Sequence, residues 1–270
     1  MKNKMEFILI GSGKVGTAFT YHLEKNGNKC IGVIEKELSN YKMFSKNIRK
    51  IKQFKIDDQL PKSNFIIVTV NDDEIENIAS NLSGNNYLNT KHIFHTSGFL
   101  SSNIFRSIKS RKVEFHSIHP LISMPNVKSA IENLPKAYFA IEGKNDIWMN
   151  EIVKIIGGKS FKILAEDKPY YHTAAVIIGN LFVGLLKMSQ VVAEQSNINE
   201  STYMKYFNPL IQSVLDNATK SGIDSALSGP IQRNDTKVIE KQIDILEKIG
   251  NEDIVNIYKG LVEYIKKVKN

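Results

Sequence analysis

The sequence predicts an α/β protein in which a doubly wound, mostly parallel sheet is followed by an all-α C-terminal domain. Two observations lead to this prediction. Up to about residue 165, short β-rich runs alternate with helical segments, which is typical of a parallel sheet with helices on both faces. From Pro169 onward there is helical periodicity and no convincing strand pattern. We therefore expect two domains, residues 1–165 and residues 166–270.

The expected strands are short runs rich in β-branched and aromatic residues, at 7–10, 30–34, 65–70, 92–95, 113–118, 138–142 and 161–164. A helix is expected over residues 15–23, where apolar side chains recur on one side. In the second domain the 3.6-residue period predicts helices over 171–196, 201–221, 236–250 and 253–267. Pro169 suits a first helical turn, and Gly222 and Gly250 suit helix ends.

The first expected strand runs into a glycine-rich turn with the spacing G-x-G-x-x-G. Gly11 allows a tight turn, Gly13 lets a pyrophosphate approach the backbone, and Gly16 packs the next helix against the sheet. Glu35 follows Gly16 by nineteen positions, where a ribose-binding carboxylate is expected about 20 residues on. A bare tight turn is the alternative, but this context favours a Rossmann domain. Its predicted cofactor-binding residues here are Gly11, Ser12, Gly13, Lys14, Val15, Gly16, Glu35 and Lys36.

Composition argues against several other classes of protein. The formal net charge is +8, yet lysines and acids are interleaved and no aromatic platform accompanies them, which disfavours a nucleic-acid partner. Cys30 is the single cysteine, so neither a disulfide framework nor a thiol nucleophile is expected. The longest apolar stretch, residues 174–186, is too short to cross a bilayer. We therefore expect a cytoplasmic protein with no membrane partner.

Polar groups follow three of the expected strands, where ligands bind in open parallel sheets. Val70 and Asn71 lead into a run of acids that either closes the cofactor pocket or caps the next helix. The second group offers hydrogen-bond donors to a nicotinamide amide and allows that amide to approach closely. Ser97 of this group is also a candidate for substrate binding. This group consists of His95, Thr96, Ser97 and Gly98. The third group begins at His119.

Three histidines, His95, His119 and His172, fall at edges of the predicted site. A scattered histidine is usually a structural residue, but an imidazole titrates near neutral pH and can exchange a proton as hydride moves. Because the three positions are far apart in the sequence and lack zinc-ligand spacing, no metal site is expected.

The first helix of the second domain carries a polar notch, because His172, Val176, Gly179 and Asn180 recur at steps of three or four residues. His172 and Asn180 are candidate catalytic residues, and a helix contact that satisfies two buried polar side chains is the alternative. In a later loop, Arg233 either holds a substrate carboxylate or belongs to a capping loop in which Asp235 starts the next helix.

With these residues the sequence resembles a family of Rossmann-like proteins with a C-terminal helical domain of formerly unknown function. That family is related to pyrroline-carboxylate reductases, 3-hydroxyacid dehydrogenases and deazaflavin-linked NADP reductases. The resemblance spans nearly the whole chain and is carried by residues 11–16, 95–98, 119–121, 171–180 and, most specifically, 226–235. Some members resemble an alternative type of ketopantoate reductase. The resemblance therefore implies reduction of a small, branched 2-oxo acid by NADP(H) or NAD(H), with 2-dehydropantoate, a precursor of pantothenate, as the best candidate.

Reductases of the related types place a catalytic lysine one helical turn before an asparagine, and here Val176 occupies that position. The proton is then expected to come from His119 or His172, while Asn180 polarises the carbonyl and Arg233 or a nearby lysine holds the carboxylate. The choice of cofactor stays open at this point. A carboxylate at Glu35 favours NAD, and Lys36 can pair with the 2′-phosphate of NADP.

Two further functions also stay open. An imine reductase of the pyrroline-carboxylate type needs no strong protein acid, because an iminium already carries charge. A non-catalytic dinucleotide sensor would explain the missing lysine but has no need of the polar notch. We also expect a homodimer through the C-terminal helices, because residues 177–186 offer more apolar surface than a few helices can cover.

Overall fold

A computed structural model describes residues 4–84, 89–109 and 112–268. The chain divides into two compact units, Met1–Gly179 and Asn180–Asn270. We expected the boundary near residue 165, before the long helix, whereas the two units divide within it. Residues 168–179 of this helix belong to the unit that contains the sheet, and Lys168 at its start is fully buried there.

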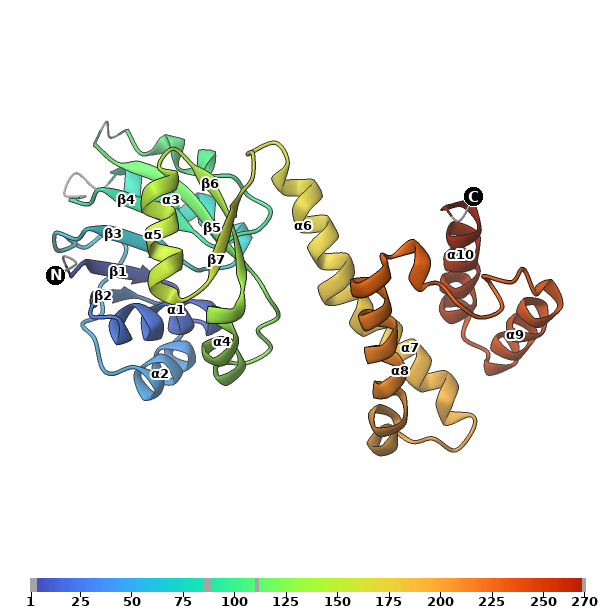
Figure 1. Ribbon diagram of the computed structural model, residues 1–270. Coiled ribbons are helices and arrows are strands. Elements are labelled where there is room, and N and C mark those ends of the chain that lie inside the picture. The colour runs from blue at the N-terminus through green and yellow to red at the C-terminus, as the bar shows by residue number, and fades with distance from the viewer. Residues whose placement is uncertain (1–3, 85–88, 110–111, 269–270) are drawn as a thin grey trace. The chain divides into compact units, whose positions relative to one another are not determined.

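In the described residues, the first unit contains one twisted sheet with the strand order β2-β1-β3-β4-β5-β6-β7 (Figure 1). Only the β5–β6 pair is antiparallel among these neighbours, so the predicted, mostly parallel sheet is confirmed. The strands are β1 (Glu6–Ile10), β2 (Lys29–Ile34), β3 (Phe65–Val68), β4 (His92–His95), β5 (Glu114–Leu121), β6 (Tyr138–Gly143) and β7 (Lys159–Lys162).

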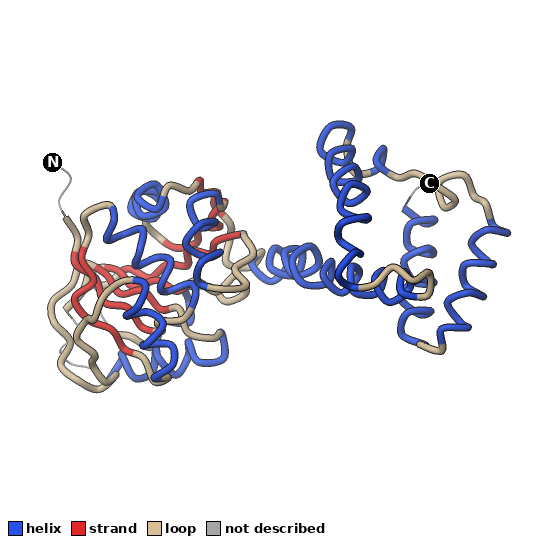
Figure 2. The backbone as a smooth tube through the Cα atoms, turned by 90° about the horizontal axis from the view of Figure 1, so that it is seen from below, coloured by secondary structure: helices blue, strands red, loops and turns tan. Residues whose placement is uncertain are grey.

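Alternate residues of the strands point into two separate cores. Phe7 and Leu9 belong to one core, and Ile8 and Ile10 belong to the other, as the two-residue period of a strand requires. The first core is covered by α1 (Lys14–Lys25), α2 (Leu38–Asn47), α4 (Val127–Asn133) and α5 (Asp146–Ile156). The second is covered by α3 (Asp72–Gly84) and the short helix η1 (Ser102–Ser107). Figure 2 shows helices on both sides of the strands.

Several strand ends differ from the prediction. β5 continues through Leu121, so His119 lies inside the strand, because antiparallel β6 supplies a register partner, Ala140, beyond residue 118. β3 ends at Val68 rather than at residue 70. The hydroxyl of the next residue, Thr69, donates a hydrogen bond to the carbonyl of Gly11 in the glycine turn. The edge strand β7 begins and ends two residues earlier than expected, following its register with β6.

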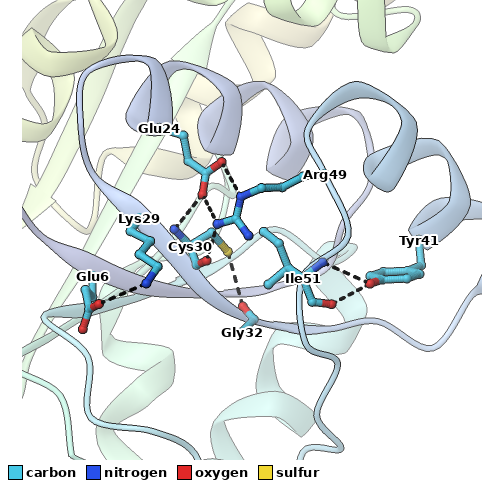
Figure 3. A network of polar contacts seen from close by, with 8 residues as sticks. All are labelled: Glu6, Glu24, Lys29, Cys30, Gly32, Tyr41, Arg49 and Ile51. Atoms are coloured by element: carbon cyan, nitrogen blue, oxygen red, sulfur yellow. Dashed lines mark hydrogen bonds and ion pairs between the residues drawn. The ribbon is translucent and has the colours of Figure 1, made fainter.

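A polar network ties β2 to α1 and to the segment after α2 (Figure 3). Arg49 donates to Glu24 Oε1 at 2.6 Å and to the carbonyl of Cys30 at 2.9 Å, and Glu24 accepts from the Cys30 amide at 3.0 Å. Burial raises the pKa of the Cys30 thiol to about 12, so this thiol stays protonated at neutral pH. The network thus fixes the strand whose carboxyl end leads to Glu35.

The long helix consists of α6 (Lys168–Val176), a π-helical turn (Ile177–Leu181) and α7 (Phe182–Glu194). It is followed by α8 (Glu200–Ser221), the short helix η4 (Asp224–Ala226), α9 (Thr236–Ile249) and α10 (Glu252–Val268), which confirms the all-α C-terminal region. The core of the second unit is small: Leu246, Ile254 and Val255 are buried against side chains such as Met188 and Tyr258.

The helix Lys168–Glu194 has 27 residues, a mean hydropathy of 1.7 in its most apolar window, and 6% of that window buried. By length and composition alone it meets the criterion for a membrane span, although core helices of soluble proteins meet it too. Our expectation from residues 174–186 was based on too short a segment, because the helix extends beyond this stretch at both ends.

Candidate functional site

The glycine turn has the geometry that phosphate binding requires. Gly11 has φ +90°, and a Cβ there would lie 2.9 Å from the backbone of Thr69. A Cβ on Gly16 would lie 2.2 Å from the carbonyl oxygen of Gly11, so this position also excludes a side chain. A Cβ on Gly13 meets nothing within 4 Å. The turn therefore leaves an open approach at Gly13, where the first-turn amides of α1 have no acceptor within the helix.

Glu35 and Lys36 lie just beyond β2, beside this turn. The Glu35 carboxylate accepts from the amide and hydroxyl of Ser12 at 2.6 and 2.9 Å, and from the amide of Glu37 at 2.9 Å. Lys36 reaches Glu74 at 3.3 Å and is largely exposed. The carboxylate therefore stabilises the turn itself, while the ammonium group stays accessible to an anion.

Val70 and Asn71 connect β3 to α3, which begins at Asp72. The carbonyl of Asn71 accepts from the amide of Glu74 at 2.9 Å, so Asn71 occupies the capping position of the helix. This supports the capping interpretation of the polar run. Thr96, on the neighbouring connection after β4, is half-buried and bonds through its amide to the carbonyl of Val68.

The Ser97 hydroxyl is fully used within the protein. It donates to Asp72 Oδ2 at 2.7 Å and accepts from the amides of Phe99 and Leu100 at 3.1 and 3.0 Å. A hydroxyl has one proton and two lone pairs, so none is left for a ligand. These bonds show that Ser97 shapes the loop that leads to Gly98, and its role in binding substrate or nicotinamide stays a prediction.

His95 is a core residue. Its side chain is fully buried, packs against Phe105 and accepts from the Ser97 amide at 3.2 Å. Burial, with a contribution from the charge of Lys168, lowers the pKa of His95 to about 3. β4 thus directs this side chain into the core under η1, and the contact of His95 with the nicotinamide stays a prediction.

His119 and His172 meet above Gly98. Their ring centroids lie 5.7 Å apart, and a Cβ on Gly98 would lie 2.4 Å from His172 Cδ2 and 2.9 Å from His119 Nε2. The hydroxyl of Tyr171 lies 2.8 Å from His119 Nδ1. The structure thus brings together three predicted residues, Gly98, His119 and His172, and adds Tyr171. We call Gly98, His119, Tyr171 and His172 the histidine cluster.

Burial sets the protonation of this cluster. Burial lowers the pKa of His119 to about 3, and the charges of Lys168 and His172 act in the same direction. Burial raises the pKa of Tyr171 to about 12. At neutral pH the imidazole is therefore neutral and the phenol protonated, so the tyrosine can donate to Nδ1 and leave the histidine proton on Nε2.

Lys168 is a site residue that sequence reasoning missed. It is fully buried, and its ammonium group donates to the carbonyl of Ser97 at 3.0 Å and to the hydroxyl of Ser117 at 2.8 Å. Burial lowers its pKa to about 8, while the nearby carboxylates of Glu142 and Asp72 act to raise it. The sequence signal for Lys168 was its position just before Pro169, at the start of an apolar helix. The signal for Tyr171 was its position next to His172.

Asn180 and Arg233 belong to the second unit. Asn180 is exposed and lies in the π-helical turn, a feature frequently found at functional sites. His172 and Val176, four residues apart in α6, share a face, whereas Gly179 and Asn180 lie in the wider π-helical turn. Arg233 is exposed and pairs with Asp235 at 2.8 Å. Asp235 stands at the N-cap of α9 without a side-chain capping bond, and the substrate role of Arg233 stays a prediction.

Comparison with known families divides the chain in two. Residues 1–120 match the model of a Rossmann-like domain, and residues 137–265 match the model of a domain of unknown function, DUF2520. The resemblance to Rossmann-like proteins with a C-terminal helical domain is thereby confirmed. Among proteins with curated descriptions, none matches the sequence.

Solved structures share the fold along nearly the whole chain. A protein from Bacteroides fragilis, provisionally described as an NADP oxidoreductase, has a TM-score of 0.81 at 16% identity, with 98% of each chain covered. Protein TM1727 from Thermotoga maritima is 27% identical, with a TM-score of 0.71 and 97% of this chain and 98% of that chain covered. A 1-pyrroline-5-carboxylate reductase from Streptococcus pyogenes has a TM-score of 0.63 at 14% identity, covering 98% and 100%.

Proposed function

Because the chain joins a Rossmann-like domain to a DUF2520 domain, we propose that it is an oxidoreductase that reduces the carbonyl of a small 2-oxo acid with NADPH. The best candidate substrate is 2-dehydropantoate, which makes the protein a ketopantoate reductase of pantothenate biosynthesis. The observation that carries the proposal is the Tyr171–His119 pair beside Gly98. It offers a proton on the same unit of the chain as an open glycine turn.

Two observations support NADPH as the cofactor. The provisional description of the similar Bacteroides fragilis protein names NADP. In this chain the Glu35 carboxylate is held by Ser12 and Glu37, while the exposed Lys36 is available to a 2′-phosphate. The open surface at Gly13 and the first-turn amides of α1 would hold the pyrophosphate.

The bound cofactor supplies a hydride to the carbonyl carbon of the substrate. As charge develops on the carbonyl oxygen, the Nε2–H of His119 donates a hydrogen bond to it and then transfers the proton. In the same step Tyr171 passes its own proton to Nδ1, so the imidazole stays neutral throughout, and solvent then reprotonates the phenolate. His172, in edge contact with His119, lines the same cluster.

Lys168 acts on this step as a positioning residue. Its two hydrogen bonds hold the carbonyl of Ser97 against Ser117, and Ser117 itself donates to the same carbonyl at 3.1 Å. This fixes the backbone that leads to Gly98. The lysine charge also lowers the pKa of His119, which keeps the imidazole neutral and able to donate from Nε2.

A second candidate is reduction of a cyclic imine such as 1-pyrroline-5-carboxylate. It is favoured by the low pKa of His119, because a histidine that stays neutral is a weak acid and a protonated imine needs none. The shared fold with the Streptococcus pyogenes reductase is compatible with it.

A kinetic comparison with two substrates tests both candidates. The purified protein is supplied with NADPH or NADH and with either 2-dehydropantoate or 1-pyrroline-5-carboxylate, and cofactor absorbance is followed. Turnover of the oxo acid supports the proposal, and turnover of the imine alone replaces it with the second candidate. Tight cofactor binding without turnover of either would favour a dinucleotide sensor.

Tyr171→Phe tests the proton path. We expect kcat for the oxo acid to fall by about 100-fold, at the lower end of the usual contribution of general acid catalysis, with little change in KM. Imine reduction should change much less, because no proton is delivered. Tyr170→Phe is the matched control, since the neighbouring Tyr170 is 81% exposed. Equal oxo-acid turnover by both variants would rule out the tyrosine as a proton donor.

A further inference from the structure

A second group of titratable side chains lies at the amino ends of β4 and β5, the sheet edge opposite the glycine turn. His92 and Glu114 are register partners across these parallel strands, and His116 follows two residues after Glu114. Residues two apart in a strand share a face, so all three side chains lie on the face that also bears Phe94. The group is therefore built by the sheet itself rather than by a loop.

The spacing of the three side chains matches a metal site. His92 Nδ1 lies 3.2 Å from His116 Nε2 and 3.2 Å from Glu114 Oε2. One ligand atom from each residue falls within 4.8 Å of the others. In a tetrahedral zinc site with bonds of about 2.0–2.2 Å, neighbouring nitrogen and oxygen ligands lie about 3.3 Å apart. Two of the three separations already have this value.

The surroundings hold these ligands in place. The ring of Trp148 stacks on His92 with centroids 4.0 Å apart and on His116 with centroids 5.0 Å apart. Asn145 donates to Glu114 Oε2 at 3.0 Å, which orients the carboxylate. His116 is buried, whereas the side chain of Glu114 is 41% exposed. A cation can therefore enter past Glu114, and a water can complete its coordination.

We propose that His92, Glu114 and His116 bind one zinc ion, with water as the fourth ligand. Two imidazoles and one carboxylate suit a borderline cation such as Zn²⁺ better than Mg²⁺ or Ca²⁺, which prefer oxygen ligands alone. The site joins β4 to β5 at their amino ends, whereas the histidine cluster lies beyond the carboxyl end of β4, so the role of the zinc ion is to stabilise the sheet. Our sequence-based expectation of no metal weighed His95, His119 and His172 and overlooked the Glu114-x-His116 spacing.

Metal titration of the whole protein tests this site. Protein freed of metal is given ZnCl₂, and bound zinc is counted by elemental analysis. Co²⁺ is then used as a spectroscopic probe, because tetrahedral coordination gives intense visible bands. We expect one metal ion per chain, tetrahedral Co²⁺ bands and a rise in the melting temperature with zinc.

Ligand variants assign the binding to these residues. His92→Gln and Glu114→Gln should each weaken zinc binding by about 100-fold or more, since loss even of outer-shell partners costs about 10–100-fold. His22→Gln and Glu6→Gln are matched controls and should bind as the original chain does. Thermal unfolding of the metal-free variants checks that they fold. Absence of stoichiometric zinc in the original chain, or undiminished binding by folded His92→Gln and Glu114→Gln, overturns the proposal.

Discussion

Single residues acquire their chemistry here mainly through burial. His119, Tyr171 and Lys168 have ordinary functional groups, but burial lowers the pKa of the histidine and the lysine and raises that of the tyrosine. The sequence pointed to His119 and His172 because histidines are few. It could not identify Lys168, because its role depends on Ser97 and Ser117, which lie 71 and 51 residues away along the chain.

Lys36 carries a prediction about cofactor choice. Lys36→Gln should raise the Kd for NADPH by about 5–10-fold, since an exposed ammonium loses a charge-assisted hydrogen bond that solvent screens in part. The Kd for NADH should stay the same, because that cofactor lacks the 2′-phosphate. Calorimetric titration of both cofactors measures the ratio, with the distant, exposed Lys109→Gln as control. An equal loss for both cofactors would contradict pairing of Lys36 with the phosphate.

Strands and helices were predictable where local sequence decides them. Apolar runs such as residues 7–10 and the period of the C-terminal helices predicted elements that the structure contains. The extension of β5 through Leu121 was not predictable, because it depends on antiparallel pairing with β6. The π-helical turn was likewise missed, since residues 177–181 fit an α-helical pattern equally well. Long-range pairing and a local change of helical period leave little trace in composition.

The glycine turn and α1 allow folding and binding to be separated. Gly16→Ala should lower the free energy of unfolding by about 1–3 kcal/mol, because its Cβ would overlap the carbonyl oxygen of Gly11. Gly13→Ala should leave stability nearly unchanged, since Gly13 has φ −67° and open space around it. It should instead weaken cofactor binding by at least about 10-fold, by blocking close approach of the pyrophosphate.

Urea unfolding and NADPH titration, carried out on both variants, measure these two effects. Normal cofactor affinity in Gly13→Ala would mean that the pyrophosphate does not approach this position. Normal stability in Gly16→Ala would mean that α1 moves to make room for the methyl group.

At the scale of the whole molecule, buried histidines predict a loss of stability in acid. The folded pKa of His95 is about 3 and the unfolded value is near 6.5, so below pH 6.5 the unfolded chain binds a proton that the folded chain does not. The stabilisation is complete above pH 6.5 and is lost as the pH falls toward 3. Between pH 7 and 5 this amounts to about 2 kcal/mol for His95.

Denaturant unfolding from pH 7 to 5 measures this loss, and His95→Gln should reduce the slope. Phe105→Leu is the control, because it weakens packing against the same ring without removing a titrating group. It should lower stability equally at both pH values. A slope unchanged by His95→Gln would assign the acid sensitivity to other groups.

The second unit exposes apolar side chains, and we predict that a second copy of the chain covers them. Leu210 and Val214, four residues apart on α8, are 61% and 48% exposed, and the buried cluster of this unit contains only a few residues among those described. Such a unit buries too little apolar surface to be stable alone. Sedimentation should therefore give about twice the chain mass of 30.5 kDa.

Charges on this face should separate the copies. Leu210→Glu combined with Val214→Glu is expected to raise the dimer dissociation constant by at least about 100-fold, because each carboxylate would have to be buried without a partner. Leu38→Glu is the control, since Leu38 is 63% exposed on α2 of the first unit. A membrane is the alternative partner for the apolar surface, because the helix Lys168–Glu194 meets the criterion for a membrane span. Flotation with phospholipid vesicles is therefore measured in parallel. A monomer that floats with the vesicles would contradict the dimer, whereas a dimer that stays in solution would show that the copies cover each other.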